Sequence, residues 1–277
     1  MNPTVAPVGR LAVCPTPIGN LEDVTLRVLD QLRHAELIAC EDTRHTKVLL
    51  DRHGIRGQLI SLHQHNEAAR ARELVARIAA GALVALVSDA GTPLVSDPGF
   101  ELIRACHEAG VHVEVLPGAS APVTALVASG LPAEHWRFVG FLPRKRGELE
   151  ELLAGATETL IAFESPRRVG ATLAILAALD PERPLAICRE LTKLHEEVIK
   201  GSASQLAKRY AKEAPRGEIV LVFGAAAAGK ASLALALDAL HQLVDAGAKA
   251  RPAAAAVAKL TGLGANELYR GLMAAGQ

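Results

Sequence analysis

Residues 84–99 read V-A-L-V-S-D-A-G-T-P-L-V-S-D-P-G, and this stretch constrains the fold more than any other. Its apolar beginning predicts a buried strand, and a helical pattern starts at about Phe100. Between them lies a loop with two Ser-Asp pairs, Ser88-Asp89 and Ser96-Asp97, in which glycines permit close backbone approach and prolines fix φ. A rigid loop at the carboxyl end of a parallel strand is typical of a ligand site, so we expect Asp89 to face a ligand. We expect Ser96-Asp97 to cap the following helix.

Short apolar runs alternate with helical patterns along most of the chain, which predicts an α/β fold with mostly parallel sheets. The expected strands of the first half are 10–16, 37–40, 58–62, 82–87 and 112–116, and those of the second are 137–142, 159–164, 185–189, 197–200 and 218–223. The short link between the strands at 185–189 and 197–200 indicates an antiparallel hairpin. We therefore expect two α/β domains, 1–130 and 131–224, followed by a helical segment at 225–277.

Composition limits the classes of partner. Lys plus Arg and Asp plus Glu are 30 each, so no global field attracts a polyanion, and any such ligand needs a local basic patch. The four cysteines are far apart, which is typical of reduced thiols. Because a signal-peptide pattern and a membrane-length apolar run are both missing, we expect a soluble cytoplasmic protein.

Three further loops follow expected strands of the first half and belong to the same sheet edge. C-P-T-P-I-G-N at 14–20 is a kinked turn, and L-P-G-A-S-A at 116–121 offers backbone N–H groups and the hydroxyl of Ser120. A-C-E-D-T-R at 39–44 carries Glu41, Asp42 and Arg44, which we expect to orient a polar substrate, with Thr43 as the cap of the next helix.

Basic side chains follow two expected strands of the second half. The residues are Arg144, Lys145, Arg146, Arg167 and Arg168. Two such clusters at neighbouring strand ends of a neutral protein indicate a localised phosphate-binding patch.

Other motifs give weaker evidence for a nucleotide, metal or nucleic-acid site. G-A-A-A-A-G-K-A-S at 224–232 has the spacing of a Walker A loop, but residue 231 is Ala and Ser232 comes one place late for a magnesium ligand. His63 and His65 have no partner that would complete a metal site, and no Gly-x-Ser-x-Gly elbow occurs. Gly262-Leu263-Gly264 indicates a helix-turn-helix-like spacing in an Ala-rich tail, where packing is favoured over nucleic-acid contact.

Taken in order, C-P-T-P-I-G-N, E-D-T-R, S-D-A-G-T-P-L-V-S-D-P-G, L-P-G-A-S-A, F-E-S-P-R-R and P-R-G-E-I-V-L-V-F-G resemble the tetrapyrrole methylase superfamily, specifically its rRNA ribose methyltransferase branch. The resemblance implies S-adenosylmethionine as methyl donor, held between two α/β domains of a homodimer. It implies 2′-O-methylation of a cytidine in the decoding region of 16S rRNA, with free rRNA or the 30S subunit as substrate. By position, the implied cofactor contacts are Pro17, Asp89, Ala90, Gly91, Thr92, Val95, Ser120, Ala121, Phe141, Leu142 and Phe163.

For the reaction itself, we expect a carboxylate to accept the proton of the ribose hydroxyl. Glu164 is the first candidate, with Glu41 or Asp42 behind it, while the arginines hold phosphates and Arg44 orients the ribose. Two other hypotheses for the function stay open at this point. One is a methylase for a tetrapyrrole or another small molecule on the same fold, and the other is a non-enzymatic nucleotide- or RNA-binding module.

Overall fold

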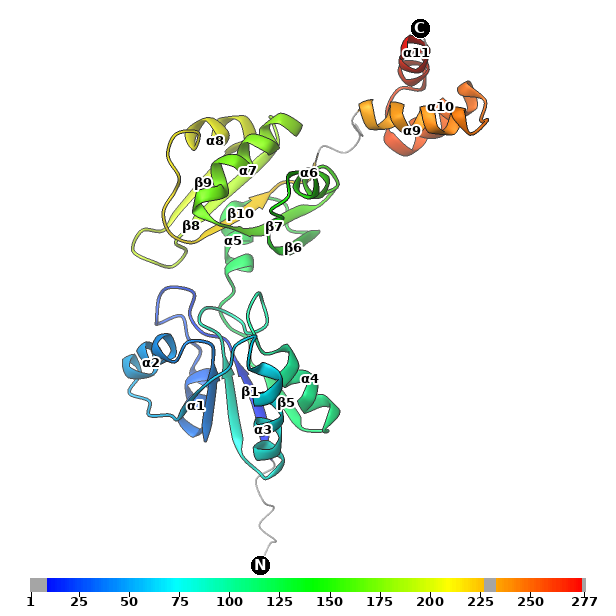
Figure 1. Ribbon diagram of the computed structural model, residues 1–277. Helices are drawn as coiled ribbons and strands as arrows, with labels where there is room; N and C mark the ends of the chain where they lie inside the picture. Colours follow the sequence, from blue (N-terminus) through cyan, green and yellow to red (C-terminus); the bar gives the residue numbers. More distant parts are fainter. Residues whose placement is uncertain (1–8, 227–232, 276–277) are drawn as a thin grey trace, which may run out of the picture.

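The computed structural model describes residues 9–226 and 233–275, which form two α/β domains followed by three helices (Figure 1). The part of the Walker-like stretch that holds Lys230 and Ser232 lies outside the described residues. All ten strands expected from the sequence are found, with ends that differ by no more than two residues.

The first sheet is entirely parallel, with the strand order β3-β2-β4-β1-β5. Its strands are β1 (Arg10–Cys14), β2 (Leu37–Cys40), β3 (Leu59–Ser61), β4 (Leu83–Val87) and β5 (His112–Val115). The helices α1 (Leu26–His34) and α2 (Thr43–Arg52) pack on one face, and α3 (Glu67–Ala79) and α4 (Phe100–Glu108) on the other. The central strands β1, β2 and β4 are therefore buried on both faces, which explains their continuous apolar runs.

The second sheet is mixed, with the order β6-β7-β10-β8-β9. Its strands are β6 (Trp136–Phe141), β7 (Thr159–Glu164), β8 (Pro184–Arg189), β9 (Glu197–Ser202) and β10 (Ile219–Phe223). Strands β6 and β7 pair in parallel, whereas β7–β10, β10–β8 and β8–β9 pair antiparallel. The predicted hairpin is confirmed. The α/β class is also confirmed, and parallel pairing dominates over the two sheets taken together, although not within the second.

Helices cover both faces of the second sheet. One face carries α6 (Arg146–Ala154), α7 (Pro166–Leu179) and α8 (Ala203–Arg209), and the other carries α5 (Ala121–Ser129). Helix α5 lies before residue 130, yet Ala125 and Leu126 pack on this second sheet. Ile18, from the loop after β1, joins the same cluster and so couples the two domains through apolar contact.

The last three helices share a core of their own. They are α9 (Leu233–Asp245), α10 (Ala250–Thr261) and α11 (Ala265–Ala275), packed through residues such as Leu240, Val257 and Leu268. Gly262 ends α10 with φ +71°, a conformation that favours glycine, so the tight turn to α11 follows from its sequence. Within residues 9–226 and 233–275, no helix is long and apolar enough to cross a membrane, and no cluster of metal-binding side chains is found.

The caps of α2 and α4 differ from expectation. Asp42, not Thr43, caps α2, because its side chain accepts a hydrogen bond from the backbone N–H of Arg44. Helix α4 is not capped by Ser96-Asp97. Its N-cap is Gly99, and the buried carboxylate of Glu67, at the start of α3, accepts hydrogen bonds from Gly99 N (2.9 Å) and Glu101 N (2.7 Å). A residue 32 positions away thus takes the capping role, which frees the second Ser-Asp pair.

Glu67→Ala leaves two N–H groups at the start of α4 without their carboxylate acceptor. We expect the free energy of unfolding to fall by about 1–3 kcal/mol in urea titrations followed by circular dichroism. Glu73→Ala on the same helix removes only exposed ion pairs with Arg70 and Arg77, so a change below about 0.5 kcal/mol is expected. Equal losses in both variants would contradict this capping role.

Candidate active site between the two domains

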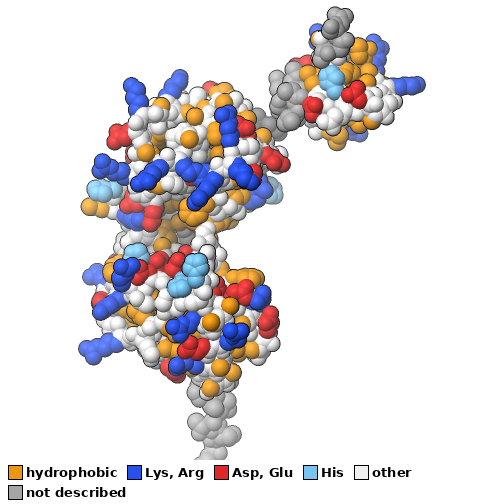
Figure 2. Space-filling model, viewed as in Figure 1, with side chains coloured by type: hydrophobic (Ala, Val, Ile, Leu, Met, Phe, Trp, Pro, Cys, Tyr) orange, Lys and Arg blue, Asp and Glu red, His pale blue; other side chains and the backbone are white. Residues whose placement is uncertain are grey.

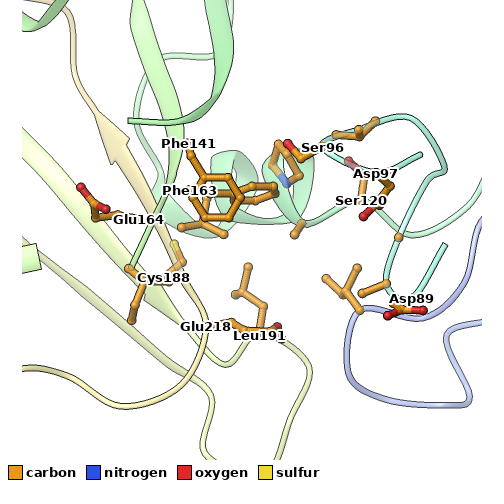
Figure 3. Close-up of a pocket in the computed structure, with 18 of the residues that line it drawn as sticks. Asp89, Ser96, Asp97, Ser120, Phe141, Phe163, Glu164, Cys188, Leu191 and Glu218 are labelled. Atoms are coloured by element: carbon orange, nitrogen blue, oxygen red, sulfur yellow. The ribbon is translucent and has the colours of Figure 1, made fainter. Parts of the chain in front are cut away.

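A cavity of about 390 Å³ lies where the loops of the first domain face the second sheet (Figure 3). This volume is within the range of about 300–1,000 Å³ that is usual for small-molecule sites. The first domain and α5 contribute Ile18, Asp89, Ala90, Gly91, Thr92, Val95, Ser96, Asp97, Ser120, Ala121 and Pro122. The second sheet and its loops contribute Phe141, Phe163, Glu164, Ser165, Pro166, Cys188, Leu191 and residues 217–220. Of the residues expected to contact a cofactor, Pro17 and Leu142 are buried and do not line the cavity.

Hydrogen bonds tie the first-domain loops together. Thr16 and Gly91 exchange backbone hydrogen bonds in both directions, with N···O distances of 2.8 and 3.0 Å. The Thr16 hydroxyl donates to the carbonyl of Ser88 (2.9 Å), and the Ser88 hydroxyl donates to the carbonyl of Gly91 (2.8 Å). Gly91 has φ +80°, and a Cβ there would lie 3.3 Å from a methyl of Ile18. The loop after β4 therefore requires glycine at this position, where it forms the floor of the cavity.

The second half of the loop after β4 holds an uncommon backbone conformation. Leu94 and Ser96 have φ of +73° and +72°, a region that non-glycine residues rarely occupy. Such conformations persist only where the surrounding structure enforces them, and they cluster at functional sites. Here they turn Ser96 and Asp97 toward the cavity instead of along α4 (Figure 3).

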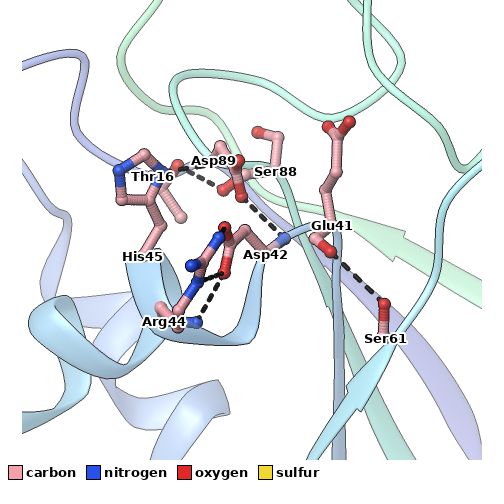
Figure 4. A network of polar contacts seen from close by, with 8 residues as sticks. All are labelled: Thr16, Glu41, Asp42, Arg44, His45, Ser61, Ser88 and Asp89. Atoms are coloured by element: carbon pink, nitrogen blue, oxygen red, sulfur yellow. Dashed lines mark hydrogen bonds and ion pairs between the residues drawn. The ribbon is translucent and has the colours of Figure 1, made fainter.

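Carboxylates from the loops after β2 and β4 lie close together (Figure 4), and of these Asp89 lines the cavity, whereas Glu41 and Asp42 do not. Asp89 accepts hydrogen bonds from the backbone N–H of Asp42 (3.0 Å), and its second oxygen lies 3.4 Å from Nδ1 of His45. Arg44, expected to orient a substrate, is instead paired with Asp42 through both side-chain oxygens. This guanidinium holds the pKa of the Asp42 carboxyl well below its usual range, so Asp42 is a poor proton acceptor.

Asp97 has the most perturbed carboxyl group of this cluster. Burial, and then the charges of Glu41 and Asp89, raise its pKa to about 7. Partial burial and Asp89 also raise the pKa of Glu41, with His63 opposing the shift. A pocket carboxyl that titrates near neutral pH is suited to accept a proton.

Glu164 does not have the expected geometry of a proton acceptor. Figure 3 shows its carboxylate pointing away from the cavity, and its side chain is fully buried. One oxygen accepts hydrogen bonds from Ser165 N (2.8 Å), and the other accepts from the hydroxyl of Thr172 (2.7 Å), while Arg168 lies 3.4 Å away. Since these groups occupy the carboxylate, Glu164 anchors the start of α7.

The basic residues of the second domain fall into two groups. Arg168 donates to the carbonyls of Leu142 and Pro143, so it fixes the segment after β6 and is not free to hold phosphates. Arg144 and Arg167 are exposed, as are Lys145 and Arg146, which pair with Glu148 and Glu150 of α6. Figure 2 shows Lys and Arg side chains spread over this face of the second domain, above the carboxylates of the first.

A loop between β8 and β9 closes another side of the cavity. Leu191 lines the cavity and is buried, and Thr192 accepts a hydrogen bond from the backbone N–H of Asn20 in the other domain (2.9 Å). Lys193 pairs with Glu190 and Glu218 at 3.0 and 2.9 Å, which holds the loop against β10. Glu190 and Thr192 have positive φ, so this connection is as constrained as the loop after β4.

The sequence pattern of Tetrapyrrole (Corrin/Porphyrin) Methylases matches residues 10–207. The chain belongs to the tetrapyrrole methylase family. Curated relatives of this methylase are named ribosomal RNA small subunit methyltransferase I. The protein from Mesorhizobium japonicum is 47% identical over 268 residues, covering 95% of this chain and 91% of that one. The protein from Escherichia coli O157:H7 is 43% identical over 270 residues, covering 95% and 94%.

Solved structures agree with this family. Uroporphyrin-III-C-methyltransferase from Thermus thermophilus superposes with a TM-score of 0.57 at 28% identity, covering 78% of this methylase and 94% of that chain. A Thermus thermophilus uroporphyrin-III C-methyltransferase in complex with S-adenosylhomocysteine gives a TM-score of 0.55 at 22% identity, covering 78% and 97%, and shares the fold.

Sequence reasoning missed two parts of the site. Asp97 was assigned to helix capping, although the repeat of the Ser-Asp pair within one loop was a signal that the second pair serves the same site as the first. The lining residues Leu191 and 217–220 come from an antiparallel part of the sheet, so the rule that ligands lie at carboxyl ends of parallel strands gave no signal for them.

The raised pKa of Asp97 predicts a pH-dependent effect on stability. Because the folded-state pKa of about 7 exceeds that of the unfolded chain, ionisation of Asp97 disfavours the folded state as pH rises between about 4 and 7. Asp97→Asn removes that cost, so its Tm is expected to exceed the wild-type Tm by a few degrees at about pH 8, with a smaller gain at about pH 5.

Differential scanning fluorimetry at the two pH values measures this effect. Asp51→Asn, an exposed change on α2, is the matched control and is expected to leave Tm unchanged at both. A gain for Asp97→Asn that is independent of pH would contradict the shifted titration.

Proposed function

We propose that this tetrapyrrole methylase transfers the methyl group of S-adenosylmethionine to the 2′-hydroxyl of a cytidine in the decoding region of 16S rRNA. The observation that carries the proposal is similarity along nearly the whole chain, at 43–47% identity, to small-subunit rRNA methyltransferases. Basic side chains at the strand ends of an otherwise neutral protein give it physical support.

The residues around the cavity fit S-adenosylmethionine. Apolar side chains, among them Ile18, Val95 and Leu191, suit the methylene groups and the aromatic base of the cofactor, and Gly91 leaves backbone open to a ligand. The carboxylate of Asp89 suits its ammonium group. Asp89–Thr92, Val95, Ser120-Ala121 and Phe163 would hold it. When bound, this cofactor supplies a methyl group that is already electrophilic.

For proton removal we assign Asp97 in place of Glu164. Its carboxyl lines the cavity, and no hydrogen bond to it is found among the described residues, so its oxygens are open to an incoming hydroxyl. Asp97 would take the proton of the ribose 2′-hydroxyl, while the bound cofactor would supply the methyl group to that oxygen and, with its carbon–sulfur bond broken, leave as a neutral thioether. Burial, and then the charges of Glu41 and Asp89, raise the pKa of Asp97 to about 7, which suits a proton acceptor at neutral pH.

For the RNA we assign the exposed cations to the phosphates flanking the target. Arg144 and Arg167 need no rearrangement, and Lys145 and Arg146 exchange weak surface ion pairs for phosphate contacts. Arg168 acts indirectly, since it positions the backbone of Leu142 and Pro143 beside this patch.

A small-molecule methylase is the second candidate, favoured by the 28% identity to a uroporphyrin-III-C-methyltransferase. Radiolabelled S-adenosylmethionine offered with 30S subunits, free 16S rRNA and uroporphyrinogen III separates the two. We expect label in RNA, at one cytidine that resists alkaline cleavage because its 2′-hydroxyl is methylated. Label in the tetrapyrrole and none in either RNA would overturn the rRNA assignment.

The proposed acceptor predicts a pH profile. The single-turnover rate is expected to rise about tenfold per pH unit and to level off above about pH 7, because only ionised Asp97 accepts the proton. Asp97→Asn should lower the plateau rate by about 100-fold or more and remove the inflection. Asp89→Asn takes away a neighbouring charge, so its inflection should move to lower pH. An unchanged profile in Asp97→Asn would exclude it as the acceptor.

We also propose that the enzyme is a homodimer. The strands β5 and β6 are open sheet edges, and Val115, Val123, Val127 and Trp136 are exposed on them and on α5 between them. Open edges and outward apolar side chains are commonly covered by a partner.

A second copy covering this surface predicts that charge there disrupts association. The double variant Val123→Glu/Val127→Glu is expected to sediment as a monomer where the wild type sediments as a dimer. Val48→Glu on α2 introduces the same charge at another exposed valine and should leave the dimer intact. A wild-type monomer at micromolar concentration would overturn the proposal.

A further inference from the structure

Three of the five phenylalanines of this chain form one aromatic cluster, and two of them, Phe141 and Phe163, line the cavity. The rings of Phe138 and Phe163 are 4.9 Å apart between centroids, and those of Phe141 and Phe163 are 5.5 Å apart, both edge to face. Figure 3 shows Phe141 and Phe163 side by side over the cavity. In a protein with only 3% aromatic residues, such a cluster is a local feature that general core packing does not explain.

A β-bulge creates this cluster. Phe138 pairs with Ile161 and Phe141 with Phe163, so β6 contains one residue more than β7 between these pairs. Regular alternation would place Phe138 and Phe141 on opposite faces of the sheet. The extra residue, with Gly140 at φ +67°, returns Phe141 to the cavity face. Bulges beside active sites commonly redirect a side chain in this way.

The redirected ring remains largely open. Phe141 is 63% exposed, whereas Phe163 beneath it is half-buried. Exposing a phenylalanine forfeits the burial that usually stabilises it, yet the segment that carries it is held firmly. The carbonyls of Leu142 and Pro143 accept hydrogen bonds from Arg168, and a Cβ on Gly140 would lie 3.6 Å from the Ser96 hydroxyl. Gly140, the residue before Phe141, thus lies against the loop that carries Asp97, and Phe141 and Asp97 line the same cavity.

We propose that Phe141 is a stacking platform for the nucleobase whose ribose is methylated. This inference rests on the proposed function and names the group that positions the target nucleotide. An unstacked base in RNA is commonly held on an aromatic ring, and such contact tolerates any base because each has a π-face. The exposed cation Arg144, three residues further on, is placed for the adjoining phosphate. The base on Phe141 and the hydroxyl at Asp97 are then two parts of one nucleotide.

The resemblance to methylases of this family implies that Phe141 contacts the cofactor. The exposure of its ring favours a contact with the RNA instead. A cofactor enclosed between the domains is reached by Phe163, which lies deeper. The outer face of Phe141 is open to solvent, where a polymer substrate has to lie.

Phe141→Ala, Phe141→Trp and Phe100→Ala test the proposal, the last as a control because Phe100 is 59% exposed and does not line the cavity. Methylation of 30S subunits gives kcat/KM, and calorimetry gives the affinity for S-adenosylmethionine. We expect kcat/KM to fall about tenfold or more in Phe141→Ala and to return within about threefold of wild type in Phe141→Trp, with cofactor affinity unchanged within about twofold. Phe100→Ala should match the wild type.

A spectroscopic arm reports stacking directly. The probe is a fragment of 16S rRNA in which fluorescent pyrrolo-cytidine replaces the target cytidine. Binding of the wild type should quench its fluorescence, and binding of Phe141→Ala should not. If Phe141→Ala kept the wild-type kcat/KM and the wild-type quenching, the inference would be overturned. It would also be overturned if the affinity of Phe141→Ala for S-adenosylmethionine fell by as large a factor as its kcat/KM. Failure of the proposed function is distinct, because the wild type itself would then methylate no RNA, and the inference would fall with it.

Discussion

The hydrogen bonds that join Thr16, Ser88 and Gly91 are the constraint on which the site depends. They lock the loop after β1 to the loop after β4, and Gly91 then becomes the floor of the cavity. Ile18, two residues beyond Thr16, reaches the apolar cluster of the second sheet. One small network therefore fixes the loops and helps to set the position of the two domains that enclose the cavity.

The two domains contribute opposite electrostatics. The first domain supplies carboxylates at the ends of parallel strands, where burial and the nearby charge of Asp89 raise the pKa values of Glu41 and Asp97. The second supplies exposed cations and an aromatic ring. The carboxylates of the first domain suit a positively charged methyl donor, and the cations of the second domain suit a polyanion. The two charge distributions therefore favour binding of donor and polyanion on different sides of the cavity.

Much of the site was predictable from local patterns. The loops at 14–20, 39–44, 88–99 and 116–121 were found because each follows an apolar run, and carboxyl ends of parallel strands share an edge. Individual roles were less predictable. Glu164 looked like a free carboxylate at a strand end, but Thr172 and Ser165 take up its oxygens. The position of Asp97 just before α4 favoured a capping role, but Glu67, from another helix, accepts the hydrogen bond at the start of α4.

The sequence by itself determined the α/β class, the ten strands, the ligand-facing loops and the family, since each depends on periodicity or on motifs within a few residues. Tertiary structure alone decided which carboxylate is open, which arginine is committed to backbone carbonyls and which face Phe141 occupies. These depend on partners distant in sequence, on a one-residue bulge in β6 and on charges brought together from different strands. No local pattern encodes such distances, because they exist only once the two sheets are assembled.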